Sequence, residues 1–177
     1  KIGLLQRYAT DWLMDQGIQP FARAPATGRH VAVVGAGPAG LACATIAAER
    51  GHRVTLFDAA GEIGGQFNLA KTIPGKEEFH ETLRYFGHRI TETGVELRLH
   101  TRVDAAGLSG FDEVVVATGV TARAVDFPGA DHPKIVGYLD VLQGRVEPGK
   151  TVAIIGAGGI GFDVAEFLVQ EGGSPTL

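Results

Sequence analysis

Cysteine is almost absent from this sequence, and the single Cys43 limits the chemistry that the chain can carry by itself. One thiol cannot close a disulfide within the chain, and it cannot supply the ligands of an iron–sulfur cluster or a structural zinc site. Cys43 lies among small residues in a predicted helix, so we interpret it as a packed side chain and not as a redox thiol. The six histidines show no metal-ligand spacing, and we predict no metal site.

Long apolar runs and an excess of one charge are also missing. The longest apolar stretches fall far short of the roughly 20 residues that a membrane span requires, and no signal segment opens the chain. The formal net charge is −4, and no window gathers Lys and Arg into a basic stripe, which argues against nucleic acid as a partner. We therefore expect a soluble, cytoplasmic protein that binds neither membrane nor nucleic acid.

Glycine, in contrast, is abundant, with 26 residues among 177, about twice the usual share of roughly 7%. Several of these glycines directly follow runs of β-branched residues. Residues 30–34 (HVAVV) predict a strand, residues 41–50 predict a helix, and GAGPAG lies between them. This order of strand, glycine-rich turn and helix is typical of a dinucleotide-binding unit.

Each residue type in this first turn has a physical role in holding a pyrophosphate. A glycine at 35 permits a tight reversal, one at 37 lets the backbone approach the phosphates, and one at 40 lets helix and strand pack closely. A proline costs nothing at the helix start, where N–H donors are unpaired anyway and the positive helix end favours anions. The predicted binding residues are Gly35, Ala36, Gly37, Pro38, Ala39 and Gly40.

A second predicted strand, at 53–57 (RVTLF), ends directly before Asp58. At this spacing from the turn, a carboxylate at the strand tip accepts hydrogen bonds from both hydroxyls of an adenosine ribose. Strand, helix and strand within so short a stretch form a right-handed parallel unit, which begins a doubly wound sheet. We therefore predict an α/β, Rossmann-like fold with Asp58 as the ribose ligand.

The same order recurs near the end of the sequence, as TVAII, GAGGIG and FDVAEFLVQ at residues 151–170. This internal repeat predicts a second strand, turn and helix, and so a second nucleotide site. Its predicted binding residues are Gly156, Gly158, Gly159, Ile160 and Gly161. By the spacing of the first unit, the residue that distinguishes NADH from NADPH would lie beyond Leu177, so both nucleotides stay open.

From about His30 to Glu171, the sequence resembles the flavin and pyridine-nucleotide half of bacterial 2,4-dienoyl-CoA reductases, within the NADH:flavin oxidoreductase and trimethylamine dehydrogenase group. The resemblance rests on VAVVGAGPAGLA, ERGHRVTLFDAAGEIGGQFNLAKTIPGKEEFHETLRYF, FDEVVVATG and VAIIGAGGIGFDVAEFL. The long central string is specific, whereas the glycine motifs are common to many flavoproteins. The resemblance implies an NAD(P)H-dependent flavoprotein oxidoreductase with two dinucleotide-binding domains, incomplete here at both ends.

In such enzymes the first turn holds FAD and the second holds the pyrophosphate of NADPH, so hydride passes from nicotinamide to FAD. The resemblance also places the GGQ and ATG motifs along the flavin. The FAD contacts that it adds are Gly65, Gln66, Val103, Ala117, Thr118 and Gly119. It further implies that electrons continue through a [4Fe–4S] cluster to FMN in a partner domain or subunit that this chain lacks. No side chain is assigned as catalytic.

The expected organisation follows from these motifs. Residues 1–29 predict an amphipathic helix, whose apolar side packs against the protein, followed by an extended linker. Residues 30–129 predict the first part of an FAD-binding domain, and 130–177 the start of an NAD(P)H-binding domain. Within them we expect a helix at about 76–93, strands at 95–99 and 111–117, and a short helix around 138–142.

Residues 1–29 resemble a different group of proteins from the rest of the chain. They are similar to the segment that joins an iron–sulfur domain to the FAD domain in glutamate synthase small subunits and in the NAD-dependent dihydropyrimidine dehydrogenase subunit. This keeps a second hypothesis open, an iron–sulfur flavoprotein subunit that takes in electrons. A third hypothesis is a nucleotide-binding fold without turnover.

Overall fold

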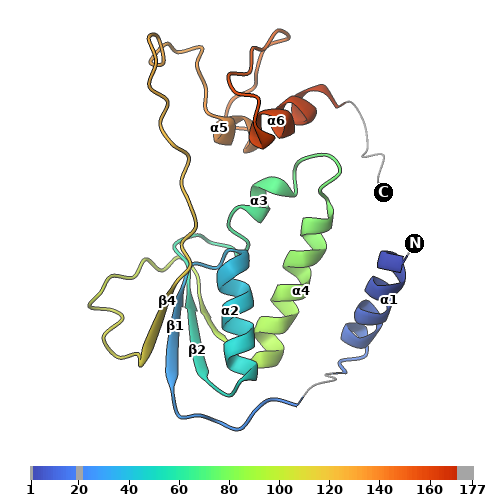
Figure 1. Cartoon of the computed structure of the whole chain (residues 1–177), viewed down its shortest axis with the longest axis vertical. Coiled ribbons are helices and arrows are strands. Elements are labelled where there is room, and N and C mark those ends of the chain that lie inside the picture. Colours follow the sequence, from blue (N-terminus) through green and yellow to red (C-terminus); the bar gives the residue numbers. More distant parts are fainter. Residues whose placement is uncertain (1, 19–21, 171–177) are drawn as a thin grey trace.

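The chain forms a parallel β-sheet with two long helices on one face (Figure 1). The computed structural model describes residues 2–18 and 22–170. The strands are β1 (His30–Val34), β2 (Arg53–Phe57), β3 (Glu96–Arg98) and β4 (Glu113–Val116). The helices are α1 (Ile2–Asp15), α2 (Pro38–Glu49), α3 (Phe67–Ala70), α4 (Glu78–Thr93), α5 (Tyr138–Leu142) and α6 (Gly159–Val169).

The sheet has the strand order β3-β2-β1-β4, and each neighbouring pair is parallel. Strand β1 pairs with β2 on one side and with β4 on the other, although β4 follows β1 only after two other strands in the sequence. The order therefore reverses at β1. In open α/β sheets, ligands bind at the carboxyl ends of the strands at such a reversal. The predicted α/β class with a parallel sheet is confirmed.

The hydrophobic core lies between the sheet and the helices α2 and α4. Alternate residues of β1 and β2 point toward the helices because side chains along a strand alternate between the two faces. Leu41 of α2 and Leu56 of β2 are completely buried, and burial of each side chain contributes roughly 1.5–3 kcal/mol. The small residues Ala44 and Ala48 let α2 lie close to the strands. The buried cluster is Val31, Val33, Ala36, Leu41, Ala44, Ala48, Val54, Leu56, Ile90 and Val95.

The opposite face of the sheet is only partly covered by the described residues. The ring of Phe111 packs against His30 and against Phe57, with centroid separations of 4.3 Å and 5.8 Å. On β4, however, the side chains of Val114 and Val116 are 42% and 73% exposed. This face is therefore apolar near β4 without being shielded there by the part of the chain that the structure describes.

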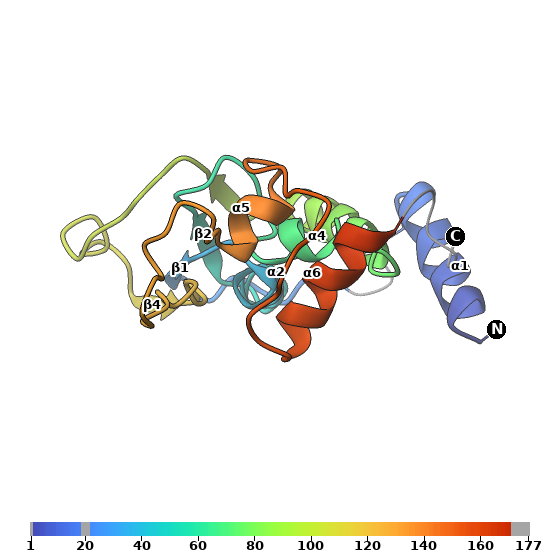
Figure 2. The ribbon, with the colours of Figure 1, turned by 90° about the horizontal axis from the view of Figure 1, so that it is seen from above.

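A second, smaller group of elements lies beyond the carboxyl edge of the sheet, where α5 and α6 pack on α3 and the segment that follows it (Figures 1 and 2). Its buried side chains are Ile73, Leu142 and Val164. Ile73 comes from the predicted FAD-binding part, and the other two come from the predicted NAD(P)H-binding part. The two parts thus share an apolar contact, while the boundary at 129 stays a prediction.

Helix α1 contacts α4 through its charged side. Arg7 Nη1 lies 2.8 Å from Glu78 Oε1, and Arg84 Nη2 lies 2.9 Å from Asp11 Oδ1. The prediction that the apolar side of this helix packs against the protein is wrong for the described residues, because the opposite charges of α4 attract the polar side instead. Its exposed apolar residues include Ile2, Leu4, Leu5, Tyr8 and Trp12.

The clearest failure among the predicted elements is the strand at 151–155, which does not form. A strand requires a hydrogen-bonded neighbour, and no described segment pairs with these residues. Val152 and Ile155 are accordingly 46% and 72% exposed. The other predicted elements are present. Strands β1 and β2 and helix α5 have the predicted bounds, α4, β3 and β4 are shorter than predicted, and α2 and α6 begin earlier. Helix α3 forms where the sequence predicted only a loop.

Candidate functional site: the carboxyl edge of the sheet

The first glycine-rich turn connects β1 to α2 and is held by both neighbouring strands. Gly35 N donates to the carbonyl of Phe57 at 2.7 Å, and Ala117 N donates to the carbonyl of Val34 at 2.8 Å. Gly35 has a φ of +108°, which only glycine adopts without strain. A side chain at this position would also clash with the carbonyl of Ala117. The turn can therefore pass between β2 and β4 only with glycine at 35.

The other two glycines of the turn have different surroundings. A Cβ atom at Gly40 would clash with the carbonyl of Gly35, so this glycine permits the close packing of α2 on the turn. A Cβ atom at Gly37 would meet no atom within 4 Å, and φ there is an ordinary −73°. The fold itself therefore does not require glycine at 37. The open space above its backbone fits a close approach by a ligand such as a pyrophosphate.

Helix α2 directs its positive end at this open space. Pro38 is the first helical residue, and no side chain caps the helix N-terminus. The N–H groups of Ala39 and Gly40 lie in the first turn, where no carbonyl of the same helix accepts from them. Together with the helix dipole they form an arrangement that binds anions.

Asp58 lies directly after β2 and reaches the same turn. One carboxylate oxygen accepts from Ala36 N at 2.6 Å, and the other accepts from Ala60 N at 2.7 Å. Each oxygen of an ionised carboxylate has two lone pairs, so one on each oxygen remains for a further donor. The side chain is half-buried, and it is held in a fixed orientation from which it can receive two hydroxyl groups.

Two further loops complete this edge of the sheet. Gly64 N donates to the carbonyl of Ala36 at 2.8 Å, and a Cβ atom at Gly65 would lie 3.1 Å from Gly37 Cα. Gln66 Nε2 donates to the carbonyl of Val120 at 3.3 Å. The GGQ loop therefore adjoins the glycine turn and is tied to the loop after β4.

The segment after β3 runs alongside Asp58 at this edge. Asp58 N donates to the carbonyl of Arg98 at 3.0 Å, and Thr101 N donates to the carbonyl of Asp58 at 2.8 Å. Val103, half-buried, follows two residues later. The structure thus brings the predicted residues of the first site to one edge of the sheet, and their contacts with a cofactor stay predictions.

The sequence did not reveal which backbone groups position these side chains. Ala60 N and the carbonyl of Val120 hold Asp58 and Gln66, yet a backbone partner leaves no mark on residue type. Asn68, which donates to the carbonyl of Ile63 at 2.9 Å and braces the GGQ loop, was also missed. The only available signal for Asn68 was its place next to the GGQ motif.

The second turn repeats the backbone geometry of the first. Gly156 has a φ of +117°, close to the +108° of Gly35. Gly158 is the extended residue before α6 and has open space at its Cβ position, as Gly37 has before α2. A Cβ atom at Gly161 would clash with the carbonyl of Gly156. The helix start formed by Gly159, Ile160 and Gly161 therefore offers the same first-turn N–H groups to an anion.

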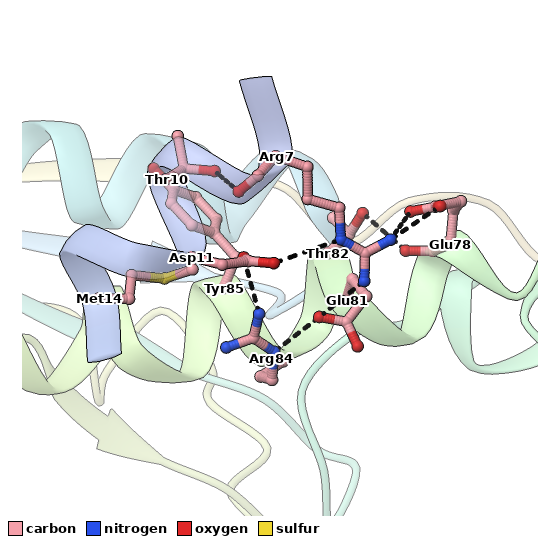
Figure 3. A pocket seen from close by; sticks show the side chains of 9 residues that line it. All are labelled: Arg7, Thr10, Asp11, Met14, Glu78, Glu81, Thr82, Arg84 and Tyr85. Atoms are coloured by element: carbon pink, nitrogen blue, oxygen red, sulfur yellow. Dashed lines mark hydrogen bonds and ion pairs between the residues drawn. The ribbon is translucent and has the colours of Figure 1, made fainter. Parts of the chain in front are cut away.

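A shallow pocket lies away from these turns, between α1 and α4 (Figure 3). Its charged groups satisfy one another: Arg84 Nε donates to Glu81 Oε2 at 2.6 Å, and this hydrogen bond lowers the pKa of the Glu81 carboxyl. Arg7 in turn holds Glu78 with two hydrogen bonds. Because these groups are occupied with each other, we assign the pocket to helix attachment and not to chemistry.

Within the described residues, no three or more His, Cys, Asp or Glu side chains gather in a way that could hold a metal ion. None of the described helices is both long and apolar enough to cross a membrane.

Comparison with known proteins extends over most of the chain. The family model described as pyridine nucleotide-disulphide oxidoreductase matches residues 29–176. The sequence is 39% identical over 170 residues to N,N-dimethylglycine/sarcosine dehydrogenase of Chromohalobacter salexigens, covering 89% of this chain and 24% of that protein. It is 29% identical over 197 residues to the small chain of glutamate synthase [NADPH] of Escherichia coli, covering 97% of this chain and 41% of that protein.

A solved structure gives the same assignment. The complex of 2-naphthoyl-CoA reductase with 2-naphthoyl-CoA is similar with a TM-score of 0.76 and 35% identity, covering 83% of this chain and 23% of that one. The chain thus spans less than half the length of each of these relatives. These similarities confirm both resemblances seen in the sequence, to the flavin and pyridine-nucleotide half of 2,4-dienoyl-CoA reductases and to glutamate synthase small subunits, and they confirm the Rossmann-like fold. The chain belongs to the pyridine nucleotide-disulphide oxidoreductase family.

Proposed function

We propose that the first turn binds FAD, that the second binds NADPH or NADH, and that the chain takes in electrons from the nicotinamide nucleotide. The observation that carries the proposal is the repetition of one backbone geometry in two turns, with glycine at +108° and +117° and open space at the second glycine of each. Two dinucleotide sites in one chain fit a transfer between two dinucleotides better than they fit the binding of one.

In this proposal different residues of the first site bind different parts of FAD. The N–H groups of Ala39 and Gly40 hold the pyrophosphate, and the free lone pairs of Asp58 receive the ribose hydroxyls. Gln66, tied to the loop after β4, holds the two loops beside the flavin ring. The residues along the adenine and flavin are Gly65, Val103, Ala117, Thr118 and Gly119. FAD, once bound, supplies the capacity to accept a hydride and release electrons singly.

The destination of the electrons is part of the proposal. A partner domain or subunit with an iron–sulfur cluster and FMN receives them, and the whole protein reduces an unsaturated acyl thioester in the manner of 2,4-dienoyl-CoA reductase. The similarity to 2-naphthoyl-CoA reductase supports this reading. We place the protein in the cytoplasm, where nicotinamide nucleotides are supplied.

One observation favours a second candidate, an electron-input subunit of the glutamate synthase type. The similarity to the glutamate synthase small chain covers 97% of this chain, against 83% for 2-naphthoyl-CoA reductase. In this alternative the two nucleotide sites keep their roles, and only the acceptor of the electrons differs.

The proposal is tested with the purified chain and FAD. The chain is incubated with FAD, freed of unbound flavin and examined for flavin absorbance at about 450 nm, after which NADPH or NADH is added without oxygen. We expect retained absorbance that the nicotinamide nucleotide bleaches, and the faster of the two nucleotides identifies the donor.

Two other outcomes separate the alternatives. A chain that retains FAD but is bleached by neither nucleotide is a binding fold without turnover. If the chain retains no flavin at all, the assignment of the first turn to FAD is wrong.

A further inference from the structure

An ion pair joins the two halves of the structure next to the second turn. Lys76 Nζ, from the segment between α3 and α4, lies 2.6 Å from Asp163 Oδ1 in α6. The two side chains are 39% and 25% exposed. Both lie close to the buried apolar cluster that Ile73 and Val164 share, so the pair sits at the rim of a packed contact.

The position of Asp163 creates an electrostatic conflict with nucleotide binding. Asp163 is the fifth residue of α6, about 6 Å along the axis from the helix start, and side chains on a helix lean toward its N-terminus. Asp163 lies beyond the first helical turn, where a charge gains little from the helix dipole. The same negative charge, however, repels an anionic pyrophosphate at the N–H groups of Gly159 to Gly161.

Lys76 removes this conflict. Its ammonium group cancels the charge of Asp163 at a distance of 2.6 Å, so the N-terminus of α6 stays attractive to an anion. Lys71 donates instead to Asn68 Oδ1 at 2.8 Å, next to the GGQ loop.

The same pair connects the two nucleotide turns mechanically. The segment that carries Lys76 continues from α3, which begins directly after Gln66 of the GGQ loop. Through Lys76, α6 is therefore anchored to the segment that leads from the proposed flavin site.

We propose that Lys76 is a positioning residue for the nicotinamide nucleotide, which neutralises Asp163 so that the second turn can bind the pyrophosphate. This inference rests on the proposed function, because it assumes that the second turn holds NADPH or NADH. It goes further by naming a residue outside both glycine motifs as a determinant of nucleotide affinity.

The proposal predicts effects of opposite sign for the two partners of the ion pair. Lys76→Met keeps the apolar stem but leaves Asp163 uncompensated, so we expect NADPH to bind about threefold more weakly, the scale for one unit charge about 7 Å away in water-like surroundings. Asp163→Asn removes the repulsion and leaves Lys76 free, so we expect equal or tighter binding. The double variant returns to within about twofold of the wild type, and Lys76→Arg retains wild-type affinity.

The experiment measures dissociation constants of NADPH and NADH for the FAD-loaded full chain, by calorimetry at low and at high salt. High salt is expected to shrink the effect of Lys76→Met, because both groups are partly exposed to solvent. Lys134→Met is the matched control, since it removes the same charge from an exposed position before α5. It is expected to leave nucleotide affinity unchanged, and FAD affinity stays constant in all variants.

Two results would overturn the inference in distinguishable ways. If Lys76→Met and Asp163→Asn weaken nucleotide binding by similar factors and the double variant is no better, the pair is only a structural tie, and the proposed function stands. If the wild-type chain holds FAD but binds neither nucleotide, the inference falls together with the assignment of the second turn.

Discussion

Substitution of Asp58 probes the first site most sharply, because its carboxylate is held in place before any ligand arrives. In Asp58→Asn the side chain keeps its size, but the negative charge and one acceptor oxygen are lost. In the wild type the carboxylate accepts from Ala36 N at 2.6 Å and from Ala60 N at 2.7 Å. We expect the variant to fold and to bind FAD more weakly.

The magnitude follows from the bonds that the ribose would lose. A hydrogen bond to a charged group contributes about 1.5–3 kcal/mol, which corresponds to about a 10- to 150-fold increase in the dissociation constant of FAD. The assay is a titration of the flavin-free chain with FAD, followed by quenching of flavin fluorescence. The free energy of unfolding of the flavin-free variant is measured beside it, to separate the ligand from the scaffold.

Asp112 provides a matched control, because its carboxylate binds the backbone at the start of β1 and that of Asp58 binds the backbone just after β1 ends. Its carboxylate accepts from His30 N at 2.6 Å, where β1 begins, just as Asp58 accepts from Ala36 N beyond the point where β1 ends. Asp112→Asn therefore disturbs a backbone bond of the same kind without touching the carboxyl edge. We expect it to change stability and to leave FAD affinity as it is. Equal FAD affinities for the wild type and Asp58→Asn would refute the ribose assignment.

Four further predictions concern the two turns and the sheet. Gly37→Ala should weaken FAD binding but leave the stability of the flavin-free chain unchanged, because the added Cβ meets no atom within 4 Å. Gly40→Ala should lower the free energy of unfolding by about 1–3 kcal/mol, as measured by thermal unfolding, because the added Cβ clashes with a backbone carbonyl. Gly158→Ala should weaken NADPH binding in calorimetry without changing FAD affinity. The hydrogen bond from Arg98 lowers the pKa of Glu96 below its ordinary value of 4.5. The stabilisation from this hydrogen bond is fully present above pH 4.5 and is lost as the pH falls through the lowered pKa of Glu96. In urea unfolding, Glu96→Gln should therefore lose less stability on acidification than the wild type does.

The first nucleotide unit could be predicted from the sequence because its determinants are local. The alternation of β1, the glycines of the turn and the acid after β2 all lie within one βαβ unit, and the chain folds that unit with the expected pairing from His30↔Arg53 to Val34↔Phe57. The spacing of residue types is sufficient wherever neighbouring segments in the sequence are also neighbours in the sheet.

The failures have the opposite character, since each depends on a partner elsewhere in the chain. The apolar run at 151–155 has the composition of a strand, but no described segment pairs with it. The apolar side of α1 was predicted to pack against the protein. Instead, Arg7 and Asp11 form ion pairs with α4, and the apolar side faces outward. The Lys76–Asp163 pair joins residues far apart in sequence, and no local pattern predicts it.

The transfer of hydride between the two proposed sites is tested most directly by isotope substitution at the nicotinamide. The FAD-loaded chain is mixed without oxygen with NADPH, NADH and their forms deuterated at C4, and flavin absorbance is followed in time. Hydride transfer between the two sites predicts bleaching by at least one nucleotide and slower bleaching when the transferred position carries deuterium. A flavin spectrum that stays unchanged with all of them would contradict it.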